Sequence, residues 1–84
     1  MFGIFFRRRR REALAKIAVL EALGEKAYDE MYDARRPQDY WNDAREMFSE
    51  AIHLAEKAGL KREARRLQDR LDHIRAVYTH QFRL

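Results

Sequence analysis

Two helix-breaking residues, Pro37 and Gly59, divide the chain into three segments with helical periodicity. Proline inside a helix removes a backbone hydrogen bond, and glycine suits the left-handed position that follows a helix. We therefore expect helices over about residues 12–35, 39–58 and 61–82. Because the connections are short, sequential helices should be antiparallel. The predicted fold class is all-α, with three antiparallel helices in one domain.

Each segment carries apolar residues at intervals of three or four, as on one face of a helix. The first stripe is Ala13, Ile17, Leu20, Gly24, Ala27, Met31 and Ala34, widened by Leu14, Leu23 and Tyr28. The second is Tyr40, Trp41, Ala44, Met47, Phe48, Ala51, Leu54, Ala55 and Ala58. The third is Ala64, Leu67, Leu71, Ile74, Tyr78 and Phe82. Since a helical glycine costs about 1 kcal/mol relative to alanine, we expect a neighbouring helix to approach closely at Gly24.

The start of the second helix allows two interpretations that differ by two residues. Asp39 can cap the helix with its side chain, or Pro37 can occupy the first helical position. Both place the preceding residue, Arg36, outside helical geometry.

The positive charge of the chain is concentrated near its N-terminus. The net charge is +4, and five of the 18 Lys and Arg residues form one run: Arg7, Arg8, Arg9, Arg10 and Arg11. The other 13 are balanced by 14 Asp and Glu residues, so the body of the chain is almost neutral. We therefore predict a flexible aromatic and basic tag over residues 1–11 and a three-helix domain over residues 12–84. The third helix is basic and the first two are acidic, which favours their packing together, although exposed ion pairs contribute little each.

Ala44, Phe48 and Ala51 have the small–aromatic–small spacing of the second helix of a tetratricopeptide repeat. The stretch from residue 27 to 82 thus resembles a single tetratricopeptide-like hairpin followed by a capping helix. Gly24 can serve as the small residue of the first helix if the hairpin is longer than usual. The resemblance implies a module that binds a peptide or protein on its first-helix face.

The chain lacks the patterns expected of an enzyme or a cofactor site. It contains no cysteine, which removes disulfides and thiolate zinc sites and fits a cytoplasmic protein. Glu50 and His53 have the spacing of one half of a di-iron motif, but the second half is missing. No serine nucleophile accompanies a histidine base, and no glycine-rich phosphate loop is present. We expect no catalytic residue, no metal and no cofactor.

Four residues at the first break form a candidate partner-binding site: Arg35, Arg36, Tyr40 and Trp41. Tyrosine, tryptophan and arginine are enriched at binding hot spots. The alternative is that Trp41 joins the core and Tyr40 lies against the end of the hairpin.

The N-terminal tag is a second candidate site. Phe2, Phe5 and Phe6 could enter a bilayer interface while residues 7–11 meet anionic headgroups. The alternatives are a disordered or fraying leader, a partner-protein groove for the aromatic residues, and contact with a nucleic-acid backbone.

These observations lead to an expected function and its alternatives. We expect a non-enzymatic adaptor or scaffold module that binds a protein or peptide, with a homodimer through leftover apolar surface as one arrangement. The alternatives are a peripheral membrane protein and, third, a nucleic-acid-associated protein.

Overall fold

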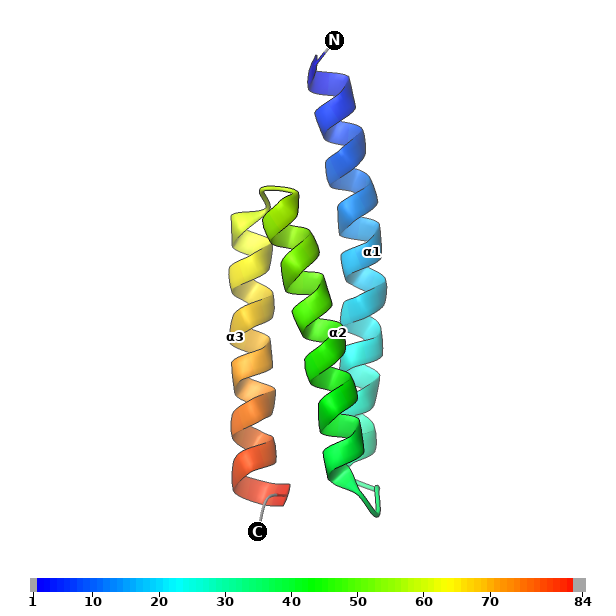
Figure 1. Ribbon diagram of the computed structural model, residues 1–84, viewed down its shortest axis with the longest axis vertical. Helices are drawn as coiled ribbons and strands as arrows, with labels where there is room; N and C mark the ends of the chain where they lie inside the picture. Colours follow the sequence, from blue (N-terminus) through cyan, green and yellow to red (C-terminus); the bar gives the residue numbers. More distant parts are fainter. Residues whose placement is uncertain (1, 83–84) are drawn as a thin grey trace.

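The computed structural model describes the backbone of residues 2–82 and the side chains of residues 7–82. Its helices are α1 (Phe2–Met31), α2 (Pro37–Lys57) and α3 (Lys61–Val77), and the chain continues from α3 into a π-helical turn, η1 (Tyr78–Phe82). No strand occurs within residues 2–82. Figure 1 shows α1 and α3 running in the same direction, with α2 antiparallel to both. The all-α, three-helix prediction is confirmed.

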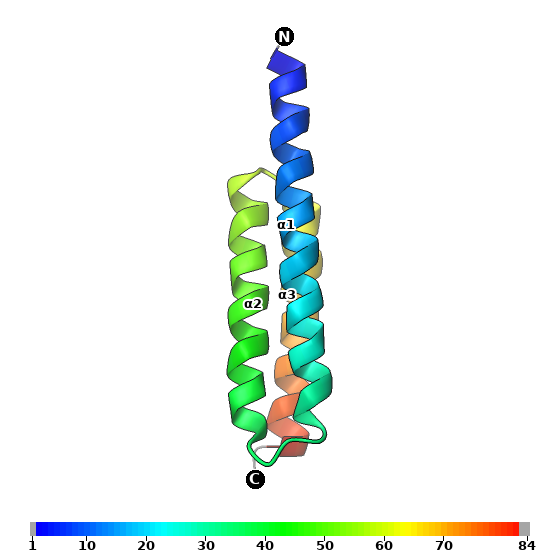
Figure 2. The same cartoon turned by 90° about the vertical axis from the view of Figure 1, so that its right-hand side faces the viewer.

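Helix α1 differs most from the expected boundaries. It begins at Phe2 rather than near residue 12, so the arginine run is part of the first helix. Arginine is a good helix former, and apolar periodicity cannot reveal helical turns that lie beyond the ends of the other helices. Figures 1 and 2 show these first turns projecting beyond the α2–α3 connection. The helix also ends earlier than expected, at Met31, where Tyr32 donates its backbone N–H to the carbonyl of Asp29 in a tight turn.

Helix α2 is bounded by the two residues that break the sequence pattern. Pro37 occupies the first turn of α2, which is one of the two interpretations of the sequence. No side chain caps the start of the helix, so the other interpretation, an Asp39 cap, is wrong. At the other end Gly59 has a φ of 73°. The N–H groups of Gly59 and Leu60 donate to the carbonyls of Glu56 and Ala55 at 3.1 and 2.8 Å. These two bonds define the glycine-terminated cap that the sequence predicts.

The core lies along α2, which contacts both other helices. Phe48 is fully buried, and so are the small residues Ala44 and Ala51 on the same face of α2. The remaining buried apolar residues are Ile17, Ala27 and Met31 of α1, Trp41, Ile52 and Ala55 of α2, and Leu67, Leu71 and Ile74 of α3. Every stripe therefore contributes residues to one shared core.

Gly24 of α1 lies directly against the ring of Phe48 of α2. A Cβ atom built on Gly24 would lie 2.7 Å from Cε2 and 2.8 Å from Cδ2 of Phe48. The aromatic ring thus occupies the space that any other residue at position 24 would need for its side chain. The neighbouring helix therefore packs on α1 at this glycine, and it does so through the Phe48 side chain.

Candidate interaction surface

The predicted site around Trp41 is not assembled on the surface. Trp41 is only 8% exposed, and its ring stacks on Tyr78 with centroids 5.3 Å apart and planes at 12°. The guanidinium of Arg75 lies 5.9 Å from the centre of the same indole ring. Trp41 therefore belongs to the core, as the alternative interpretation held, while Arg35 and Arg36 lie exposed in the connection before α2.

Tyr40 points to a different place, a groove between α1 and α2. With Leu23, Ala27 and Met47 it forms the apolar lining of a hollow of about 340 Å³. A second hollow of about 310 Å³ shares Tyr40 with the first and continues toward the α1–α2 connection. The charged residues that line the two hollows are Lys26, Asp29, Glu30, Asp33 and Asp43. Four of these five are acidic, and we call this surface the acidic groove.

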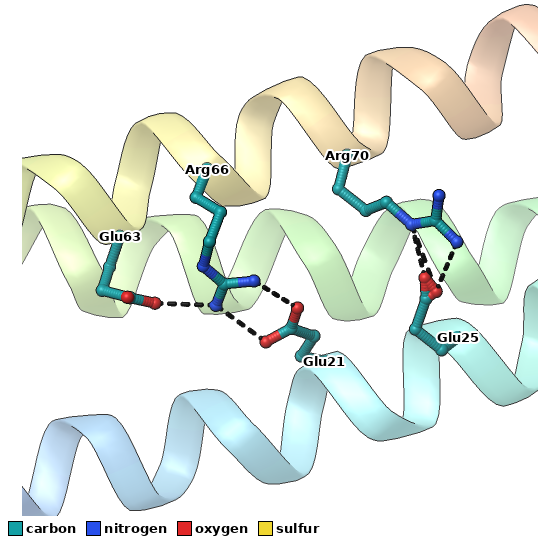
Figure 3. Close-up of polar contacts among 5 residues, drawn as sticks. All are labelled: Glu21, Glu25, Glu63, Arg66 and Arg70. Carbon is teal, nitrogen blue, oxygen red and sulfur yellow. Dashed lines mark hydrogen bonds and ion pairs between the residues drawn. The ribbon is translucent and has the colours of Figure 1, made fainter.

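The opposite side of α1 is closed by ion pairs to α3 (Figure 3). Arg66 donates two hydrogen bonds to the carboxylate of Glu21, at 2.6 and 2.9 Å, and a third to Glu63 at 2.7 Å. One helical turn further along, Arg70 donates to the Glu25 carboxylate and lies 5.3 Å from the centre of the Tyr28 ring. The side of α1 that faces α3 is thus spanned by the protein's own side chains.

These contacts shift the acid–base properties of the residues that make them. The hydrogen bond from Arg66 lowers the pKa of Glu21, and the hydrogen bonds to Glu21 and Glu63 raise the pKa of Arg66. The hydroxyl of Tyr28 lies 3.1 Å from that of Tyr32, and this hydrogen bond, together with burial, raises the pKa of Tyr28 to about 12. The Glu21 carboxylate is therefore more strongly stabilised in its charged form when the protein is folded.

The lowered pKa of Glu21 predicts an acid-dependent loss of stability. The contribution should be complete above the ordinary glutamate pKa of about 4.3 and disappear as the pH falls through the lower folded-state value. Between about pH 6 and pH 3, the free energy of unfolding should fall more steeply for the natural protein than for Glu21→Gln. Urea unfolding at a series of pH values measures this. Glu50→Gln, at an exposed position of α2, should keep the steeper slope; equal slopes for all three proteins would contradict the prediction.

The arginine run forms a helical, exposed surface at the projecting end of α1. Where α1 passes the end of α2, a hollow of about 410 Å³ is lined by the apolar residues Ala13, Leu54 and Ala58. Its charged residues are Arg9, Arg10, Glu12, Lys16 and Lys57, four of them basic. The side chains of Phe2, Phe5 and Phe6 lie outside the described residues.

Several apolar side chains of α1 remain uncovered. Val19, Leu23 and Leu14 are 60%, 48% and 42% exposed. The prediction that Leu14 and Leu23 widen the core stripe is therefore wrong, because α2 and α3 cover a narrower sector of α1. Val19 belongs to none of the predicted apolar stripes. A large apolar residue outside every stripe is what indicates, in the sequence, a second apolar surface on this helix.

The remaining pattern of metal-ligating residue types is the Glu50–His53 pair. Glu50 and His53 are both exposed on α2, and no group of three or more metal-ligating side chains occurs among the described residues. Within the same part of the chain, no helix combines the length and apolar character needed to cross a membrane.

The fold and its surfaces define a small all-α domain of three helices with an acidic groove on one side and a basic projecting helix end. Comparison of the chain with protein-family models, curated proteins and solved structures gives no match.

Proposed function

We propose that the protein is a non-enzymatic interaction module whose acidic groove binds a basic, amphipathic helical segment of a protein partner. The observation that carries this proposal is the composition of the groove. An apolar lining of Leu23, Ala27, Tyr40 and Met47 is bordered by four carboxylates and one lysine. Amphipathic helices bind such grooves through their apolar face, and the charged rim selects partners of opposite sign.

The packing of α1 against α2 supports an adaptor whose helical hairpin resembles that of a tetratricopeptide repeat. Ala44, Phe48 and Ala51 all have no exposed surface, and Phe48 lies directly against Gly24. In this proposal the hairpin is longer than a standard repeat, α3 acts as its capping helix, and binding uses the α1–α2 side.

A designed helical peptide with leucines along one face and arginines along the other tests the proposed groove. We expect its fluorescence anisotropy to rise on titration with the protein, and a peptide with glutamates in place of the arginines to bind far more weakly. Glu30→Lys combined with Asp43→Lys should weaken binding by roughly tenfold or more, because it reverses charge at the rim.

The matched control is Glu56→Lys combined with Asp69→Lys, which makes the same change in net charge at exposed positions outside the groove. Equal losses of affinity in the two double variants would show that only net charge matters, and the groove proposal would then fail.

A second candidate function, docking on an anionic membrane surface, is favoured by the projecting end of α1. Residues 7–11 are all exposed there, beside the hollow with four basic residues. Basic residues near such a surface contribute about 1 kcal/mol each. In co-sedimentation, this function requires pelleting with anionic but not neutral vesicles, and loss of pelleting when Arg7, Arg8 and Arg11 are replaced by glutamine. Recovery of the protein in the supernatant with both vesicle types would eliminate it.

A further inference from the structure

A second stripe of residues at intervals of three and four lies on the exposed side of α1. Its members are Arg8, Glu12, Ala15, Val19, Ala22 and Lys26, and every one of them is exposed. The most exposed large apolar residue described, Val19, lies at its centre between two alanines. Small residues on both sides of Val19 would allow another helix to approach closely.

The charge of α1 is strongly unequal along its length. Its N-terminal part carries the arginines of residues 7–11, whereas its C-terminal part carries Glu25, Asp29 and Glu30. Two such helices packed in parallel would bring like charges together, and the antiparallel arrangement would bring opposite charges together. Electrostatic complementarity of this kind sets the orientation of an interface.

We propose that a second copy of this chain packs antiparallel on the α1 stripe, with Val19 of each copy facing the other on a two-fold axis. This inference rests on the proposed function. It identifies the basic helical segment at the acidic groove as the N-terminal part of α1 from the second copy. Such an interface is closed and self-complementary, which is the commonest arrangement of soluble dimers.

The register centred on Val19 also pairs the charges. Residues that lie equally far from Val19 on its two sides face each other in an antiparallel pair. Glu12 is then opposite Lys26 of the other copy, and Arg8 is opposite Glu30. Both pairs combine opposite charges, and each occurs twice in the dimer.

The shape of the molecule leaves room for this arrangement. The first turns of α1 extend past the α2–α3 connection, so the protein's other helices do not cover them (Figures 1 and 2). In the dimer this projecting end lies beside the C-terminal end of the other α1. Asp29 and Glu30 border the acidic groove there. The only intrachain ion pair of the stripe that the structure records within residues 7–82, Arg8 with Glu12 at 3.5 Å, is highly exposed and readily exchanged.

The solution mass of the full chain is the first test. Sedimentation equilibrium should give twice the chain mass of 10.2 kDa. Val19→Arg should weaken dimerisation by at least ~30-fold, as expected for a central interface residue. Ala76→Arg adds the same side chain at an exposed position of α3 and should remain dimeric. A monomer at all concentrations, or equal behaviour of the two variants, would overturn the proposal.

A charge exchange tests the orientation and the register. Arg8→Glu combined with Arg9→Glu should be monomeric, and so should Asp29→Lys combined with Glu30→Lys, since each homodimer would face like charges. An equimolar mixture of the two variants should regain the dimer mass, because every charge pair is then opposite again. If the mixture stays monomeric while the natural chain is dimeric, the antiparallel arrangement is wrong.

The variant Arg8→Glu with Arg9→Glu also distinguishes a failure of the dimer from a failure of the proposed function. Its substitutions should prevent dimerisation, but they leave the residues of the acidic groove unchanged. If that variant binds the designed basic peptide while the natural chain is monomeric, only the dimer is wrong. If it binds no peptide and the natural chain is monomeric, both proposals fail.

Discussion

Phe48→Ala should remove most of the stability of this domain. Phe48 is fully buried in the cluster that α2 forms with Ile17 and Met31 of α1 and with Leu67 and Leu71 of α3. Truncation of a core phenylalanine costs about 3–5 kcal/mol. A domain of 84 residues has only about 4–13 kcal/mol of stability in total at typical values per residue. Urea unfolding followed by circular dichroism should therefore show a large shift of the midpoint, or a chain already unfolded in buffer.

Two further variants provide reference values for the loss of stability in Phe48→Ala. Phe48→Leu keeps most of the apolar volume and should cost less than about half as much. Leu14→Ala removes an apolar side chain that is already 42% exposed, and its effect should be smaller still. If Leu14→Ala destabilised the protein as much as Phe48→Ala does, the core would not be centred on α2.

The fold was predictable because its signals are local. Pro37 and Gly59 end or begin helices through the geometry of their own backbone. Each apolar stripe can be recognised from the residue spacing within one helix. The start of α1 was not predictable in this way, because its first turns project from the bundle and carry no apolar pattern set by packing. The end of α1 was misplaced since Ala34 continues the stripe although the chain has already turned.

The candidate surfaces depend on contacts between residues far apart in the sequence. Trp41 is buried partly because Tyr78 of η1, 37 positions later in the sequence, stacks on it. Arg66 and Arg70 each pair with a glutamate 45 positions earlier, a relation visible in the sequence only as a basic third helix. Tyr40 was predicted as part of a binding site with Arg35, Arg36 and Trp41, but in the structure it lines the acidic groove with Leu23 and Ala27 of α1, and only the packing of the two helices shows this.

Gly24→Val should destabilise the domain, although it adds apolar surface. The first added carbon would already lie 2.7 Å from the ring, and Phe48 is held on all sides by the core. Overpacking of this kind costs typically ~1–3 kcal/mol or more, whereas replacing a helical glycine in an open position gains up to about 1 kcal/mol. Gly24→Ala should show the same conflict in milder form, with a net loss despite the better helix propensity of alanine.

Thermal and urea unfolding of both Gly24 variants measure this conflict, with Ala18→Val as the control for a β-branched residue at an exposed position of the same helix. The loss should be specific to the contact with Phe48, so Phe48→Leu should destabilise the Gly24→Val protein less than it destabilises the natural one. A double-mutant cycle of the two positions measures that coupling directly. Additive effects would mean that the ring yields to the new side chain without cost, and the packing of Phe48 against α1 would then not depend on glycine.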